Sequence, residues 1–116
     1  MIRVKRVYEA PSRKDGFRIL VDRLWPRGLT KERAAVDLWL KDVAPSAELR
    51  KWFGHEPARW NQFQTRYRKE LTKNKSALAQ LRQKAGDRTV TLVYGARDEE
   101  HNEALVLKKI LEARTR

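Results

Sequence analysis

The stretch Ile19-Leu20-Val21-Asp22-Arg23-Leu24-Trp25-Pro26-Arg27-Gly28, residues 19–28, changes character halfway along its length. It begins with a short apolar run rich in β-branched residues, which is typical of a buried strand. It continues with a carboxylate, two guanidiniums and an indole, together with a proline and a glycine that break regular structure. Ligands usually bind where a strand of an α/β sheet ends in such a loop. The stretch therefore predicts a strand over residues 17–24 that leads into a binding site.

The rest of the chain supplies the partners of this strand. Apolar patterns predict further strands over residues 2–8, 36–40 and 89–94. The connection at residues 11–16 is short for a parallel crossover, so the first strand could run antiparallel to the second, and its direction stays open. These strands alternate with helical segments, and the fold class is therefore α/β, with a small, mostly parallel sheet of about four strands flanked by about four to five helices. We expect a single domain over residues 1–116.

Capping residues and hydrophobic spacing predict where the helices begin and end. Thr30 starts a short helical turn, and Ser46 starts a helix that Gly54 ends. A longer helix begins at Pro57, and another ends at Gly86. Asp98 is the expected N-cap of the last helix, where an acidic residue suits the positive end of the helix dipole. A frayed basic tail is expected at residues 114–116.

The composition excludes several classes of protein. The chain has no cysteine, which rules out disulfides, thiolate-bound zinc and a thiol nucleophile. The N-terminus has no apolar signal region, and no segment approaches the roughly 20 apolar residues of a membrane span. The sequence therefore predicts a soluble cytoplasmic protein without a membrane partner. Its two histidines have no ligand spacing and it has no glycine-rich nucleotide loop, so no metal and no cofactor is predicted.

Positive charge is concentrated in the first three quarters of the chain. The net charge is +12, and residues 1–86 hold 21 Lys and Arg against 9 Asp and Glu. Such an excess calls for an anionic partner or for a basic face in contact with water. The partner could be a small anion or a nucleic acid, and the sequence assigns no oligomeric state.

Three polar loops follow predicted strands and would meet at one edge if those strands are parallel. In such a site Asp22, Asp98 and His101 are the candidates for proton transfer. The candidates for binding are Arg23, Trp25, Arg27, Lys41, Ser46, Tyr94, Arg97 and Asn102. Arginine forks and the helix N-terminus at Ser46 suit a phosphate or carboxylate. Each residue also has a structural interpretation: an Asp22–Arg23 ion pair, packing for Trp25, capping for Ser46 and Asp98, and surface exposure for His101.

A second hypothesis concerns the basic helices between residues 57 and 85. They carry many cations, and four of them fall at helical spacings that could form one face: Arg59, Arg66, Lys69 and Lys73. Such a face would bind phosphates without reading bases, because no known base-reading motif is present. The alternative function is therefore non-sequence-specific binding of nucleic acid. A basic surface that serves only solubility is the third possibility.

Three sequence blocks resemble the YeaO-like branch of the bacterial domain of unknown function 488 family. They are GFRILVDRLWPRG at residues 16–28, WLKDVAPS at 39–46 followed by LRKWF at 49–53, and TLVYGARDEEHN at 91–102. The resemblance covers nearly the whole chain in order, and it implies a site shared by the same three loops but no agreed activity. Longer members of the family carry a Cys-His-Arg triplet near the place of Glu100-His101-Asn102, so their thiol chemistry does not transfer to this chain.

Overall fold

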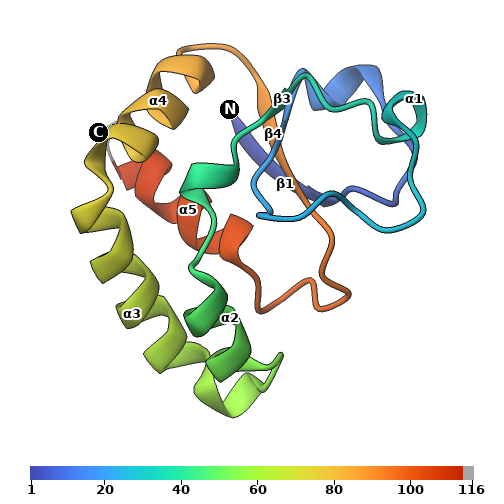
Figure 1. Ribbon diagram of the computed structural model, residues 1–116. Coiled ribbons are helices and arrows are strands. Elements are labelled where there is room, and N and C mark those ends of the chain that lie inside the picture. The colour runs from blue at the N-terminus through green and yellow to red at the C-terminus, as the bar shows by residue number, and fades with distance from the viewer. Residues whose placement is uncertain (114–116) are drawn as a thin grey trace.

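The protein is built around one parallel sheet of four strands (Figure 1). The computed structural model describes residues 1–113. The strands are β1 (Ile2–Arg6), β2 (Phe17–Leu20), β3 (Leu38–Trp39) and β4 (Val90–Tyr94), and their order in the sheet is β1-β4-β2-β3. All three neighbouring pairs are parallel. The predicted α/β class with a small parallel sheet is confirmed.

The first strand lies beside β4 rather than beside β2. Ile2 and Phe17 both align with Val90, so β4 is the central strand between them. The antiparallel alternative for the first strand is therefore wrong. A short connection between β1 and β2 suffices because it crosses only one strand, β4. The connection contains a 3-10 turn, η1 (Arg13–Asp15). The carbonyl of Asp15 in this turn accepts a hydrogen bond of 2.7 Å from the Thr91 hydroxyl of β4.

Every strand is shorter than its apolar pattern predicts: β1 ends at Arg6 rather than at residue 8, β4 begins one residue late at Val90, and β2 and β3 differ most. β2 ends at Leu20, although the Val21 N–H still donates to the Val93 carbonyl at 3.2 Å. β3 has two residues instead of the five predicted. Beyond these points the backbone bonds become isolated or are replaced by side-chain contacts, which an apolar pattern does not report. The polar part of the opening stretch therefore leaves the sheet earlier than expected.

Five α-helices accompany the sheet, namely α1 (Lys31–Ala34), α2 (Ala47–Phe53), α3 (Trp60–Lys73), α4 (Lys75–Ala85) and α5 (Glu103–Ala113). The predicted N-caps Thr30 and Ser46 are confirmed, since each side chain accepts a backbone N–H of its helix. Gly54 ends α2 in the left-handed region at φ 54°, as predicted. A second 3-10 turn, η2 (Lys41–Val43), precedes α2, and a third, η3 (Pro57–Arg59), precedes α3.

The start of the last helix differs from the prediction. Asp98 does not cap α5, because the helix begins five residues later at Glu103. The Asp98 Oδ1 instead accepts the N–H groups of Glu100 and His101, at 2.9 and 3.1 Å, and closes a tight turn. The side-chain oxygen of Asn102 accepts the Leu105 N–H at 3.2 Å and caps the helix. Aspartate and asparagine side chains both form such local hydrogen bonds, so the residue type alone does not tell which of Asp98 and Asn102 caps the helix.

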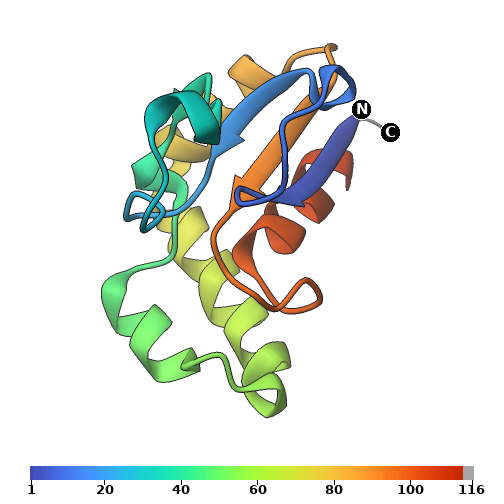
Figure 2. The ribbon, with the colours of Figure 1, turned by 90° about the vertical axis from the view of Figure 1, so that its right-hand side faces the viewer.

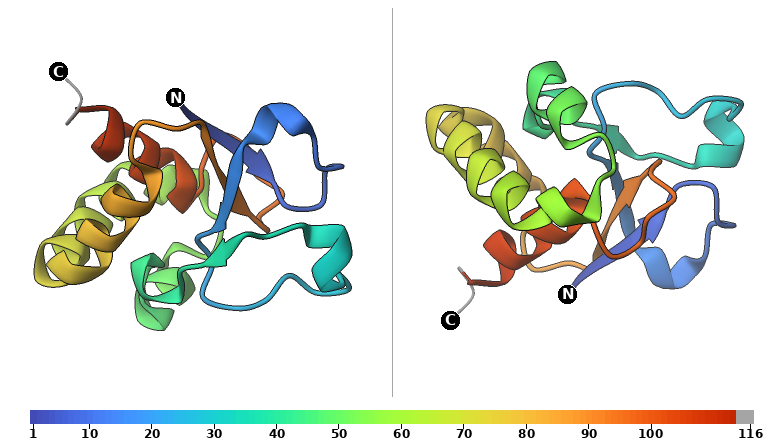
Figure 3. Two further views of the ribbon diagram at one scale, coloured as in Figure 1. Left: turned by 90° about the horizontal axis from the view of Figure 1, so that it is seen from above. Right: turned by 90° about the horizontal axis from the view of Figure 1, so that it is seen from below.

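The two faces of the sheet are covered differently. Figures 2 and 3 show helices α2 to α5 against one face, whereas α1 and the loops from the first 36 residues lie over the other. The helical side holds the main core, which includes Ile19, Leu92 and Tyr67. The loop side holds a smaller cluster around Leu20 and Val93. The predicted tail at residues 114–116 lies outside the described residues.

Candidate functional site

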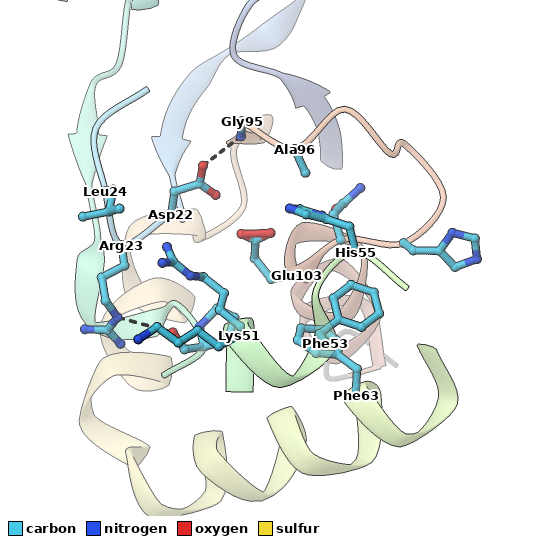
Figure 4. Close-up of a pocket in the computed structure, with 14 residues that line it drawn as sticks. Asp22, Arg23, Leu24, Lys51, Phe53, His55, Phe63, Gly95, Ala96 and Glu103 are labelled. Carbon is cyan, nitrogen blue, oxygen red and sulfur yellow. Dashed lines mark hydrogen bonds between the residues drawn. The ribbon is translucent and has the colours of Figure 1, made fainter. Parts of the chain in front are cut away.

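A pocket opens beside the carboxyl ends of β2 and β4 (Figure 4). Its volume is about 400 Å³, which is within the range of small-molecule sites. Three segments line it: the loop after β2, the stretch from Pro45 through α2 into α3, and the segment from the end of β4 into α5. The lining residues are Asp22, Arg23, Leu24, Pro45, Arg50, Lys51, Phe53, His55, Phe63, Gly95, Ala96, His101, Asn102 and Glu103.

Asp22 joins two of these segments. Its Oδ2 accepts a hydrogen bond of 2.8 Å from the Gly95 N–H (Figure 4), and its carbonyl accepts one from the Trp39 indole at 2.8 Å. A Cβ atom at position 95 would stand 3.0 Å from that Oδ2, so glycine allows the close approach. The Asp22 carboxylate is thereby held in a fixed orientation at the pocket.

Glu103 faces Asp22 from the first turn of α5, and Figure 4 shows the two carboxylates pointing toward one another. Burial and the charge of Asp22 raise the pKa of Glu103 well above its ordinary value, and the nearby Arg50 only partly opposes this rise. Two carboxylates this close favour sharing one proton over carrying two charges. The proton of the pair is therefore held more tightly on Glu103 than on an isolated glutamate.

Cationic side chains surround this carboxyl pair. The Arg23 guanidinium donates to the carbonyls of Pro45 and Ala44, at 3.3 and 3.2 Å, which holds it against the chain before α2. Within residues 1–113 no ion pair joins it to Asp22, and none involves Arg50 or Lys51. The last two side chains are exposed and line the pocket without a carboxylate within ion-pair distance.

His101 is held by Asp98 at the end of the loop after β4. Its Nδ1 lies 2.8 Å from Asp98 Oδ2, and its ring meets the edge of the Trp60 ring with centroids 5.3 Å apart. Burial raises the pKa of Asp98, but hydrogen bonds from Glu100 and His101 outweigh it and hold that pKa below its ordinary value. A proton on Nδ1 would leave Nε2 as an acceptor. No serine, threonine, tyrosine or cysteine lines the pocket beside it.

Four of the eleven predicted site residues line this pocket, and they are Asp22, Arg23, His101 and Asn102. Asp98 contacts it through His101. The structure does not bring the remaining six into the lining, which are Trp25, Arg27, Lys41, Ser46, Tyr94 and Arg97. Arg27 and Arg97 are exposed, whereas Tyr94 is buried in the core.

The other three have structural partners. Trp25 packs edge-on against Trp39 with ring centroids 5.4 Å apart, and Lys41 Nζ lies 4.1 Å from the Trp39 ring centroid. The Ser46 hydroxyl and N–H donate to the Glu70 carboxylate at 2.5 and 2.9 Å. A carboxylate therefore already occupies the position at Ser46 where an anion was expected.

The predicted site did not include the contribution of α2 or of Glu103. The predicted site omitted six lining side chains with polar or aromatic groups, namely Arg50, Lys51, Phe53, His55, Phe63 and Glu103. The adjacent cations Arg50 and Lys51 in the helix after the third strand could have indicated that this helix contributes to an anion site. Glu103 had a signal too, since it would stand at the same sheet edge if Asn102 had been taken as the cap.

Residues 1–113 contain no group of three or more His, Asp and Glu side chains arranged to hold a metal ion. In the same residues, none of the helices combines the length and the apolar character needed to span a bilayer.

Known proteins resemble the chain over almost its full length. It matches the family described as "Inactive DUF488-N3 subclade" over residues 1–116. It is 46% identical over 113 residues to an uncharacterised protein of Mycobacterium tuberculosis (strain H37Rv), which covers 97% of this chain and 95% of the relative. It is 43% identical over 106 residues to the uncharacterised protein YeaO of Escherichia coli K12, covering 91% and 92%. No solved structure matches the chain. The chain belongs to the domain of unknown function 488 family, within its DUF488-N3 subclade and among YeaO-like proteins.

Proposed function

We propose that the pocket binds a small anionic molecule and holds it without chemical turnover. The observation that carries this proposal is the pair Arg50 and Lys51 in the lining of the pocket. Both cations are exposed and neither forms an ion pair within residues 1–113. Charge-assisted hydrogen bonds from such groups to a phosphate or carboxylate are stronger than neutral ones. Arg23 adds a third positive charge whose position is fixed by main-chain carbonyls.

Two further observations favour binding over catalysis. The lining offers no hydroxyl or thiol nucleophile beside the Asp98–His101 pair, so a histidine base would have no protein group to activate. The description of the matching family calls its subclade inactive. Asp22, Asp98 and His101 then orient the loops and the ligand rather than transfer protons.

The test is calorimetric titration of the protein with phosphate, sulfate and citrate at low salt. We expect saturable binding of at least one anion, and an affinity lower by about 10-fold or more in Arg50→Gln and in Lys51→Gln, because each loses one charge-assisted contact. Lys109→Gln is the matched control, since Lys109 is exposed on α5 outside the pocket. Equal losses in the control and the two pocket variants, or no binding of any of the three anions, would refute the proposal.

A second candidate function, non-sequence-specific binding of nucleic acid, is favoured by one observation on α3. This helix has four exposed cations, namely Arg66, Arg68, Lys69 and Lys73. None of the four takes part in an ion pair formed within residues 1–113. Arg66 and Arg59 lie over the Trp52 ring, 4.1 and 5.5 Å from its centroid. If this surface binds phosphates, log K should fall with log salt concentration by about 0.9 per phosphate contacted in duplex DNA. Absence of DNA and RNA binding at low salt removes this candidate.

A further inference from the structure

The pocket combines opposite charges in a way that a simple anion would not use. A ligand with negative charge alone would place that charge near the Asp22–Glu103 carboxyl pair, which repels it. A ligand that also presents an N–H donor or an ammonium group would bind the same pair favourably, because a carboxylate accepts hydrogen bonds from cations strongly. The negatively charged group of the ligand would then bind the cations of the pocket, and its ammonium group would bind the carboxyl pair.

The positions of the lining side chains suit such a ligand. In Figure 4, Arg23 and Lys51 lie on one side of Glu103, whereas Phe53 and Phe63 lie on the other. In this view the Glu103 carboxylate lies between the cations and the aromatic rings, and the Asp22 carboxylate lies above it. Phe53 and Phe63 are buried and pack with centroids 4.5 Å apart, so they form a rigid apolar wall. The same pocket therefore offers cations, a carboxyl pair and aromatic rings to one molecule.

We propose that the pocket recognises a zwitterionic molecule of the amino-acid class with an apolar side chain. This inference rests on the proposed binding function: it keeps the negatively charged group that the cations bind and adds an ammonium group, so that the ligand has no net charge. The ligand's carboxylate lies against Arg50 and Lys51, its ammonium group lies between Asp22 and Glu103, and its side chain lies against Phe53 and Phe63. In an amino acid both charged groups are on the carbon that bears the side chain, so one small molecule reaches all three sets of residues.

Three commercially available probes isolate the contributions. L-phenylalanine carries both charged groups, 3-phenylpropionate lacks the ammonium group, and phenethylamine lacks the carboxylate. Titration of the 116-residue protein by NMR and calorimetry should show phenylalanine binding at least about 10-fold more tightly than either analogue. The amides of Gly95 and of the first turn of α5 should shift during the phenylalanine titration.

A double variant tests the role of the carboxyl pair. Asp22→Asn with Glu103→Gln removes the negative charge and keeps an oxygen that can accept the Gly95 N–H. Its affinity for phenylalanine should fall to that for 3-phenylpropionate, while its affinity for 3-phenylpropionate should stay the same or rise. A purely structural role of the pair would instead weaken both ligands together, and that outcome would overturn the inference.

The outcomes separate this inference from the proposed function. If 3-phenylpropionate binds as tightly as phenylalanine, the zwitterion inference is wrong and the anion-binding function stands. If phenethylamine binds as tightly as phenylalanine, the carboxylate contributes nothing and the zwitterion inference is wrong, while the titrations with phosphate, sulfate and citrate decide the proposed function. If none of the three probes binds but phosphate or citrate does, only the zwitterion inference fails. If no probe and no anion binds, both are wrong.

Discussion

The side chain of Asp22 holds the backbone of Gly95, and this single hydrogen bond of 2.8 Å joins the loop after β2 to the loop after β4. This hydrogen bond lies just beyond the end of the backbone pairing between β2 and β4, in which the Val21 N–H makes the last bond, to the Val93 carbonyl. The walls of the pocket on this side are therefore positioned by a side chain rather than by the sheet itself.

Replacing Asp22 should separate its two roles. Asp22→Asn and Asp22→Ala both remove the charge beside Glu103, but only the asparagine keeps an acceptor for Gly95. Because a partly buried N–H without an acceptor is costly, we expect Asp22→Ala to be less stable than Asp22→Asn by about 1–3 kcal/mol in urea denaturation. Equal stabilities would show that water replaces the carboxylate at no cost.

Glu103 should make the stability of the protein depend on pH. Its pKa is raised in the folded state, so between the ordinary value of about 4.3 and the folded value the folded protein binds more protons than the unfolded chain. Stability then falls as pH rises through this window. Glu103→Gln removes the effect and should be more stable than the parent protein above the window, with the difference shrinking at lower pH.

The exposed residue Glu100 supplies the control for that measurement. Glu100→Gln removes one carboxyl group outside the pocket, and its pH profile of thermal unfolding is the reference for that of Glu103→Gln. A Glu103→Gln profile that runs parallel to that of the parent protein would mean that Glu103 ionises in the folded protein as it does in the unfolded chain.

Tyr67 should contribute to stability through its hydroxyl group. It is fully buried, and its hydroxyl donates to the Val43 carbonyl at 2.5 Å, which ties α3 to the 3-10 turn η2. Tyr67→Phe leaves that carbonyl without its donor and should cost about 1–3 kcal/mol in unfolding free energy. The exposed Tyr8 also donates to a carbonyl, that of Arg27, and Tyr8→Phe should cost clearly less. A similar loss in both variants would contradict the role of burial.

The ion pair between Asp15 and Arg18 should be far more important than those on the surface. Its atoms lie 2.6 Å apart and both side chains are less than 5% exposed. Arg18→Met leaves the buried carboxylate with Lys5 as its remaining cation and should destabilise the protein by about 3–5 kcal/mol in urea denaturation. Lys108→Met breaks the exposed pair with Glu112 and should cost less than about 1 kcal/mol. Comparable values for the two variants would disprove the assignment.

Local patterns predicted most of the fold. The caps at Thr30 and Ser46, the glycine stop at Gly54 and the strand that contains Val90 follow from interactions within a few residues, and these predictions are confirmed. The direction of the first strand could not be predicted, because its partner β4 lies almost 90 residues away in the chain. The start of the last helix was wrong because an aspartate and an asparagine competed for the cap.

The position of the site was easier to predict than its members. Parallel strands bring the ends of β2 and β4 to one edge, so Asp22, Arg23, His101 and Asn102 line one pocket. Trp25 lies only two residues beyond Arg23, yet it packs against Trp39 on the other side of the sheet. A loop turns toward the face of the sheet on which it can bury its apolar side chains. The spacing of residues in the sequence does not predict which face that is.

The central position of β4 also constrains how the chain is made. β1 emerges first from the ribosome, but its sheet partner within residues 1–113 is β4, at residues 90–94. Four fifths of the chain must be synthesised before the first strand can pair, and the sheet cannot form progressively from the N-terminus. Until then β1 and β2 are exposed strand edges in the nascent protein, and β4 closes both of them when it arrives.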